Sequence, residues 1–105
     1  MGMRENLEAM LAAGHDNALL RFTLGNLLLK QGQLSGAAEH LRQAVTLDPG
    51  YSAAWKVYGK ALQSLGDHDG AVKAYESGVT AARKKGDIQA AKEMQVFVRR
   101  LKKDV

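Results

Sequence analysis

The sequence predicts an all-α protein built from antiparallel helix hairpins, about six helices in total. Three observations lead to this fold class: a repeat of 34 residues, apolar residues at helical spacing, and glycines that interrupt the helices at matching places. With 105 residues the chain has the length of a single domain, 1–105, and its one proline leaves long stretches free to form helix.

The repeat is found by placing residues 18–51 above residues 52–85. Glycine is hard to exchange where the backbone requires it, and three of the identical positions are glycines. Chance could supply one or two matches, but hardly seven in one register. The seven identical pairs are Gly25 and Gly59, Leu28 and Leu62, Gly32 and Gly66, Gly36 and Gly70, Ala37 and Ala71, Val45 and Val79, and Thr46 and Thr80.

Each unit carries two apolar stripes with the spacing of amphipathic helices, separated by a glycine turn. We expect Ser35 and Asp69 to cap the second helix of each unit, and Pro49 to end the first unit. The stripes of the first unit are Leu20, Leu24, Leu27 and Leu28, then Ala37, Ala38, Leu41, Ala44 and Val45. Those of the second unit are Ala54, Trp55, Tyr58, Ala61 and Leu62, then Ala71, Val72, Tyr75 and Val79.

Gly25 and Gly59 fall in the middle of predicted helices, at the same phase of both units. A glycine there costs about 1 kcal/mol relative to alanine. We therefore expect a neighbouring helix to pass too close for a β-carbon, with the small residues Ala37 and Ala71 on the opposing side.

The flanks of the two units are predicted to be structural end pieces. Residues 3–14 match the phase of a second helix and are expected to form a half-repeat. Residues 87–103 place Ala91, Met94, Phe97, Val98 and Leu101 on one stripe and are expected to form a capping helix, with Asp87 as its N-cap.

These positions resemble the tetratricopeptide repeat (TPR) family. The resemblance implies a right-handed TPR-like α-solenoid that binds a protein or peptide partner and is not an enzyme. Three positions depart from the family pattern, Arg21, Gly78 and Arg83, and the last predicts a helix that runs on through Lys84 and Lys85. The matching positions are Leu24, Gly25, Leu28, Gly32, Ala37, Leu41, Ala44 and Pro49, then Trp55, Tyr58, Gly59, Leu62, Gly66, Ala71 and Tyr75.

In TPR proteins the first helices of the units line a concave groove that holds extended peptides or a partner helix. The resulting mixture of apolar and cationic side chains is expected to favour an acidic peptide, or a peptide with a C-terminal carboxylate, that has an apolar anchor. A purely structural role of the apolar members, with the lysines as a solvated face, is the alternative. The family's ligand-facing phases fall here on Leu19, Phe22, Asn26, Leu29, Lys30, Lys56, Lys60 and Gln63.

Chaperone-binding members of the family hold a peptide carboxylate with a clamp of Lys and Asn residues. Only Asn26 fits that clamp. The other four positions carry Phe22, Val57, Asp87 and Ala91. The sequence therefore argues against a chaperone co-factor role of this kind.

Composition and motifs exclude several chemistries. The chain has no cysteine, so disulfides and thiolate zinc sites are ruled out, and a cytoplasmic location is expected. His15, His40 and His68 show no metal-binding spacing, so no metal, cofactor or catalytic residue is predicted. No apolar run is long enough for a membrane helix.

The positive charge is concentrated near the end of the chain. The segment from Arg83 onward holds eight of the 15 Lys and Arg residues and three of the 11 Asp and Glu residues. Two alternatives to peptide binding follow: homodimerisation through the helix at 87–103, and the less favoured contact of this basic segment with nucleic acid. Its lack of base-stacking aromatics, apart from Phe97 on the apolar stripe, argues against the second.

Overall fold

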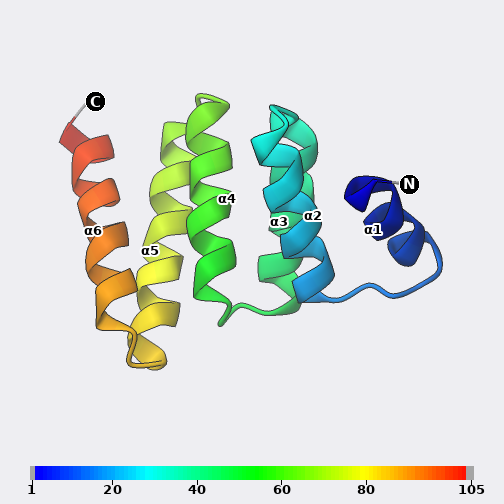
Figure 1. Ribbon diagram of the computed structural model, residues 1–105. Coiled ribbons are helices and arrows are strands. Elements are labelled where there is room, and N and C mark those ends of the chain that lie inside the picture. The colour runs from blue at the N-terminus through cyan, green and yellow to red at the C-terminus, as the bar shows by residue number, and fades with distance from the viewer. Residues whose placement is uncertain (1, 104–105) are drawn as a thin grey trace.

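The computed structural model describes residues 2–103, and within that range the chain forms six helices and no strand (Figure 1). This confirms the all-α prediction. In chain order the helices are α1 (Met3–Ala12), α2 (Ala18–Lys30), α3 (Leu34–Leu47), α4 (Ser52–Ser64), α5 (His68–Lys84) and α6 (Ile88–Lys103).

The helices stack as hairpins along one axis. Helix α2 pairs with α3 and α4 pairs with α5, while α3 also contacts α4 and α5 also contacts α6. We refer to α2, α4 and α6 as first helices and to α3 and α5 as second helices. The result is an elongated body measuring 42 × 29 × 18 Å, with α1 and α6 at its two ends (Figure 1).

Glycine ends the first helix of both hairpins. Gly32 and Gly66 have φ values of 77° and 85°, a region that side-chain-bearing residues rarely adopt. The residue after each glycine, Gln33 or Asp67, donates its backbone N–H to the carbonyl of Leu28 or Leu62 at 2.9 Å. This is the Schellman arrangement, which closes the helix and reverses the chain in three residues.

Because these turns are so short, two of the three predicted N-caps are wrong. Helices α3 and α5 begin directly after Gln33 and Asp67, so Ser35 and Asp69 lie inside the helices. The cap of α5 is Asp67, whose Oδ1 accepts a hydrogen bond from the Gly70 backbone N–H at 2.9 Å. The third predicted cap is correct: Asp87 Oδ1 accepts from the Ala90 N–H at 3.1 Å.

The two mid-helix glycines lie in equivalent surroundings. A β-carbon on Gly25 would lie 2.7 Å from Leu41 Cγ, and one on Gly59 would lie 2.5 Å from Tyr75 Cε1. The predicted close approach is therefore present in both hairpins. The opposing atoms, however, are mainly those of the large side chains Leu41 and Tyr75, with only the Ala37 carbonyl oxygen also near Gly25.

Gly78, one of the departures from the family pattern, also marks a close contact. A β-carbon there would collide with the Met94 sulfur of α6 and lie 3.0 Å from the Trp55 Cβ of α4. Glycine at this position thus lets α5 sit between two first helices that carry large side chains.

Helix α5 runs past Arg83 to Lys84, with Lys85 as its C-cap, so it is extended as predicted but ends one residue earlier. Helix α6 consequently starts 36 residues after α4, at Ile88 against Ser52, and not 34. This shift of two residues changes which side chains of α6 lie beside those of α4.

Candidate protein-binding face

The eight predicted groove residues lie on α2 and α4, and we refer to them as the first-helix face: Leu19, Phe22, Asn26, Leu29, Lys30, Lys56, Lys60 and Gln63. Four of them, Leu19, Lys30, Lys60 and Gln63, are exposed. The other four are partly buried, so the structure divides the set into two groups.

Phe22 and Leu29 belong largely to the helix contacts. Both pack against the core cluster formed by α2, α3 and α4, and the Phe22 ring centroid lies 5.0 Å from that of Tyr51. Aromatic pairs at this distance stabilise packing beyond the area they bury. These contacts support the alternative interpretation, in which Phe22 and Leu29 have a structural role in helix packing.

The two lysines of α4 are engaged by α6. Lys56 Nζ forms an ion pair with Glu93 Oε1 at 3.1 Å, and Lys60 Nζ lies 6.0 Å from the Phe97 ring centroid. The Phe97 ring is held in place by Tyr75, with the centroids 5.2 Å apart. Glu93 and Phe97 thus extend the face onto α6.

Sequence reasoning missed Glu93 and Phe97 because it continued the period of 34 into α6. With the start of α6 shifted to Ile88, a different set of α6 residues comes beside α4. The length of α5 could have revealed this, since Arg83 in place of proline had already indicated a longer helix.

The three lysines of the first-helix face differ in how far their positive charge is offset by neighbouring groups. Glu93 offsets the charge of Lys56, whereas Lys60 is exposed beside an aromatic ring and Lys30 is exposed in the last turn of α2. A cation over an aromatic face keeps its charge and remains able to pair with an anion. The positive charge of the face therefore comes mainly from Lys60 and Lys30. Lys56 contributes less because it pairs with Glu93.

Gln63 is held by a neighbouring hydroxyl. The Tyr75 hydroxyl donates a hydrogen bond to Gln63 Oε1 at 3.2 Å. Burial raises the pKa of Tyr75 to about 12, so the hydroxyl keeps its proton at neutral pH. The amide nitrogen of Gln63 is not used by this contact and is available as a donor.

A separate polar cluster joins the α1–α2 loop, α2 and α3. Arg21 Nε and Nη2 donate to the two carboxylate oxygens of Asp16 at 2.8 and 3.0 Å, and Arg21 Nη1 lies 3.1 Å from His40 Nδ1. Arginine can only donate, so His40 Nδ1 accepts and the imidazole is neutral. Burial and the adjacent Arg21 charge lower the pKa of His40, against the weaker opposing effect of Glu8, Glu39 and Asp16.

This cluster predicts a pH dependence of stability. The folded protein holds the pKa of His40 below its ordinary value of 6.5, so the unfolded chain binds more protons as the pH falls through that region. The free energy of unfolding should therefore decrease as the pH is lowered from 7.5 to about 5.5. Denaturant titrations at several pH values measure the effect.

The matched variants for this test are His40→Gln and His68→Gln. His40→Gln should flatten the pH dependence in this window, whereas exposed His68 does not contact the cluster and its replacement should leave the slope unchanged. Equal slopes in the wild type and the His40 variant would contradict the role given to this contact. The Asp16 carboxylate titrates at lower pH because Arg21 lowers its pKa below 3.8, outside this window.

The hairpin pattern and the glycine contacts agree with a comparison to known families. The tetratricopeptide repeat family model matches residues 28–94, well over half of the chain.

The chain belongs to the tetratricopeptide repeat family.

Similar proteins support this assignment along nearly the whole length. The TPR repeat-containing protein PA0015 of Pseudomonas aeruginosa is 56% identical over 99 residues, covering 94% of each chain. The solution structure of protein BPP2914 from Bordetella parapertussis is 53% identical, covers 99% of this chain and 90% of that one, and has a TM-score of 0.81. The fold extends to PcrH, crystallised in complex with the chaperone binding region of PopD, with a TM-score of 0.89 at 17% identity, covering 96% and 77% of the two chains.

The shift in α6 also bears on the TPR carboxylate clamp. Displaced by two residues, the clamp positions of the third first helix fall on Gln89 and Glu93, in place of Asp87 and Ala91. Neither is basic, and Glu93 carries the charge that would repel a carboxylate. The corrected register therefore also argues against this clamp, with Gln89 and Glu93 as the residues at the two positions.

TPR proteins are in general non-catalytic scaffolds. Between residues 2 and 103, no group of three or more His, Asp or Glu side chains is arranged to hold a metal ion. No helix in the same range has both the length and the apolar character to cross a membrane.

Proposed function

We propose that this TPR protein binds a segment of a partner protein across the first-helix face, and that the segment carries an acidic group next to an apolar side chain. The observation that carries the proposal is that exposed apolar and cationic side chains occur together on adjacent first helices. Leu19 and Lys30 come from α2, and Lys60 comes from α4.

The apolar part of the proposed contact is Leu19. Its side chain is 64% exposed in the first turn of α2, the largest exposed fraction among the exposed large hydrophobic side chains of residues 2–103. Phe22 follows one turn later and is only partly buried. An apolar side chain of the partner would cover Leu19 and the free edge of Phe22.

The cationic part is Lys60, with a contribution from Lys30. Lys56 contributes less because Glu93 already pairs with it. An acidic side chain of the partner would gain a charge-assisted contact with Lys60, while Asn26 and Gln63 provide hydrogen-bonding groups. The PcrH complex with a region of PopD is a precedent for a neighbour of the same fold that binds a protein segment.

Replacing Lys60 with glutamate tests the proposal. We expect binding of an acidic peptide to weaken about fivefold, or about 1 kcal/mol, because an exposed attraction becomes a repulsion. The probes are two synthetic peptides with the same leucine anchor, flanked either by Asp and Glu or by Lys. Titration into ¹⁵N-labelled protein should shift amides of α2, α4 and α6 with the acidic peptide.

The control variant is Arg83→Glu, which changes the net charge equally from an exposed position on α5. It should bind the acidic peptide like the wild type. Amide shifts confined to α3 and α5, or an equal loss of binding in both variants, would refute the assignment of the face. Helicity measured by circular dichroism should be the same in all three proteins.

A further inference from the structure

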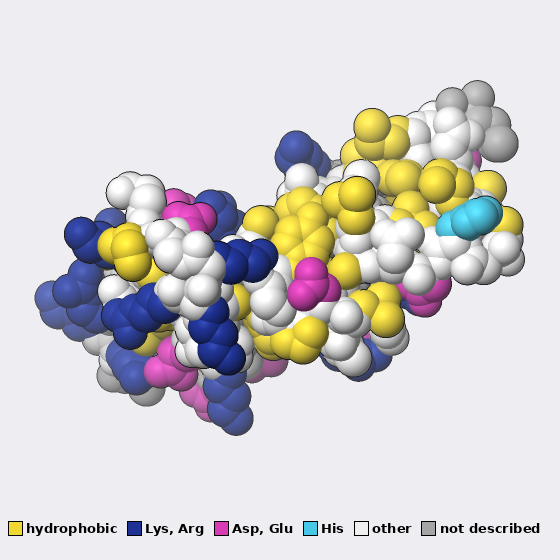
Figure 2. All heavy atoms as spheres, turned by 90° about the horizontal axis from the view of Figure 1, so that it is seen from below, with side chains coloured by type: hydrophobic (Ala, Val, Ile, Leu, Met, Phe, Trp, Pro, Cys, Tyr) yellow, Lys and Arg dark blue, Asp and Glu magenta, His cyan; other side chains and the backbone are white. Residues whose placement is uncertain are grey.

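The α1 end of the molecule carries an uncovered apolar edge. Helix α1 occupies the position of a second helix against α2, with Leu7 and Leu11 packed on the neighbouring core cluster. None of its residues is buried, and Met3 and Met10 are 62% and 48% exposed. These two methionines are seven residues apart, so they share one face of the helix. Figure 2 shows hydrophobic side chains gathered at this end of the molecule.

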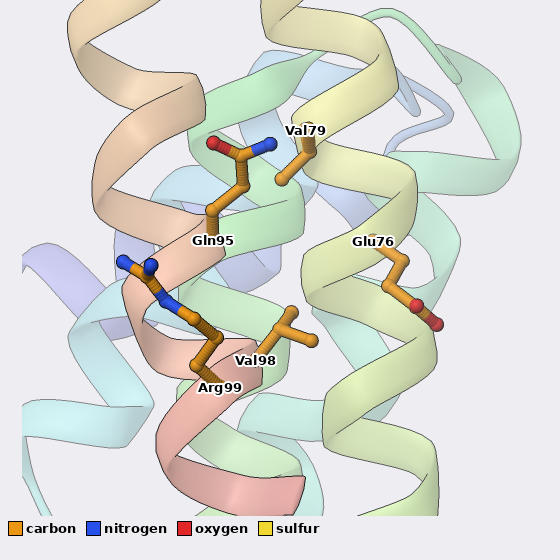
Figure 3. Close-up of a pocket in the computed structure, with 5 residues that line it drawn as sticks. All are labelled: Glu76, Val79, Gln95, Val98 and Arg99. Carbon is orange, nitrogen blue, oxygen red and sulfur yellow. The ribbon is translucent and has the colours of Figure 1, made fainter.

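The opposite end carries a groove between α5 and α6 with a mixed apolar and polar lining. A cavity of about 410 Å³ is lined by Glu76 and Val79 of α5 and by Gln95, Val98 and Arg99 of α6. Figure 3 shows Val79 and Val98 in the space between the two helices, with Arg99 on the α6 side. A second hollow of about 260 Å³ continues the same seam past Glu76 to Val72 and Leu101.

The groove lies where a further second helix would pack. Inside the molecule, the corresponding side of α4 is covered by α5: Leu62 packs on the α5 core, and Gly59 contacts Tyr75. With the shift of 36 residues, Val98 corresponds to Leu62. Among the described residues, α6 is thus a first helix without a second helix, and α1 is a second helix without a first.

The net charges of the two ends have opposite signs. Helix α6 contains five Lys and Arg residues and one Glu, whereas α1 contains two Glu and one Arg. Figure 2 shows the basic side chains gathered at the α6 end. Contact between two α6 helices would bring like charges together, which disfavours a dimer through this helix. Contact between α1 and α6 avoids this repulsion, because α1 carries a net charge of −1 and its Arg4 and Glu8 pair with each other at 3.3 Å.

We propose that two copies of this chain associate head to tail, with α1 of one copy packed in the α5–α6 groove of the next. Met3 and Met10 would contact Val79 and Val98, and the pair α6–α1 would form a hairpin across the interface. Methionine suits such a groove because its unbranched side chain adapts to irregular apolar surfaces. Each copy offers both surfaces, so the contact is heterologous and can add further copies.

One residue limits the strength of this contact. Gln95 stands at the position of α6 that corresponds to Gly25 and Gly59, where glycine permits the close approach in the internal hairpins. The glutamine side chain holds an incoming helix farther away. The association is therefore expected to be weaker than an internal hairpin, reversible and dependent on concentration.

Sedimentation over a series of concentrations, from micromolar to millimolar, tests the proposal on the 105-residue chain. The weight-average mass of the wild type should rise with concentration and should not level off at the dimer. Two variants remove one surface each. Met3→Lys with Met10→Lys changes only exposed side chains of α1 and places positive charges opposite the basic α6, and Val98→Lys places a charge in the groove. Each variant alone should remain a monomer.

Mixing the two variants gives the decisive result. The α1 variant keeps an intact groove and the groove variant keeps an intact α1, so an equimolar mixture should form a dimer that does not grow further. An interface between two α6 helices would instead leave the α1 variant associated. If Val98→Lys proves unfolded by circular dichroism, Arg99→Glu, at an exposed rim position, replaces it.

A wild type that stays monomeric up to millimolar concentration would overturn the proposal, as would a mixture of variants that shows no dimer. None of these substitutions changes the first-helix face, and no peptide is used. Failure of head-to-tail association is therefore distinguishable from failure of the proposed peptide binding.

Discussion

Replacing Gly59 with alanine is expected to destabilise the protein by about 2 kcal/mol, although alanine is the better helix former. The added β-carbon would lie 2.5, 2.7 and 2.8 Å from three atoms of the Tyr75 ring, which is itself fully packed in the core. Overpacking of this kind costs about 1–3 kcal/mol, which exceeds the gain in helix propensity of about 1 kcal/mol where the ring cannot move. Urea denaturation measures the difference.

The matched control is Gly36→Ala in α3. Its β-carbon would meet only Leu28 Cδ1 at 3.5 Å, an ordinary contact. That substitution should therefore be neutral or stabilise the protein by up to about 1 kcal/mol. In a Tyr75→Val background the cost of Gly59→Ala should shrink, since the ring is gone. A stabilising Gly59→Ala in the wild-type background would show that the helix pair can separate without cost.

Truncation of Leu41 to alanine is expected to lower the free energy of unfolding by about 3 kcal/mol, a typical cost for a fully buried leucine. Leu41 is 0% exposed and lies opposite Gly25 in the α2–α3 hairpin. Removing it leaves a cavity beside Gly25, where the two helices approach closely. The effect is a large fraction of the total stability of a domain of this size.

Leu47→Ala provides the comparison on the same helix. Leu47 lies at the end of α3 and is 50% exposed, so its truncation should change stability by less than about 0.5 kcal/mol. Thermal unfolding of the two variants followed by circular dichroism gives both values. Similar costs for Leu41 and Leu47 would contradict the core described for this hairpin.

The helices and their hairpin pairing could be predicted because glycine carries specific backbone information. Gly32 and Gly66 mark turns that need positive φ, and Gly25 and Gly59 mark close approaches, so both kinds of position were visible in the sequence. The predicted N-caps of α3 and α5 lie two residues too late because the sequence does not show how tightly a Schellman turn connects two helices. The division into repeats at 18–51 and 52–85, with end pieces at 3–14 and 87–103, stays a prediction.

The binding face could be predicted only in part. The period of 34 residues placed α2 and α4 in register, but the extra length of α5 moved α6 out of that register and concealed Glu93 and Phe97. Sequence patterns also do not separate an apolar residue that faces a groove from one that packs between helices. Phe22 belongs to both groups, since its ring packs at a tilt against Tyr51 while the residue remains partly exposed.

The order of contacts along the stack has a consequence for how the chain folds. Most contacts join helices that follow one another in sequence, α2 with α3, α3 with α4, α4 with α5 and α5 with α6. Because these contacts are local in sequence, no long loops have to be closed and little conformational entropy is lost in forming them. Folding is therefore expected to be rapid and to start in either central hairpin. Amide protons of α1, which contributes no buried residue, should exchange with solvent by local opening long before those of α4 and α5.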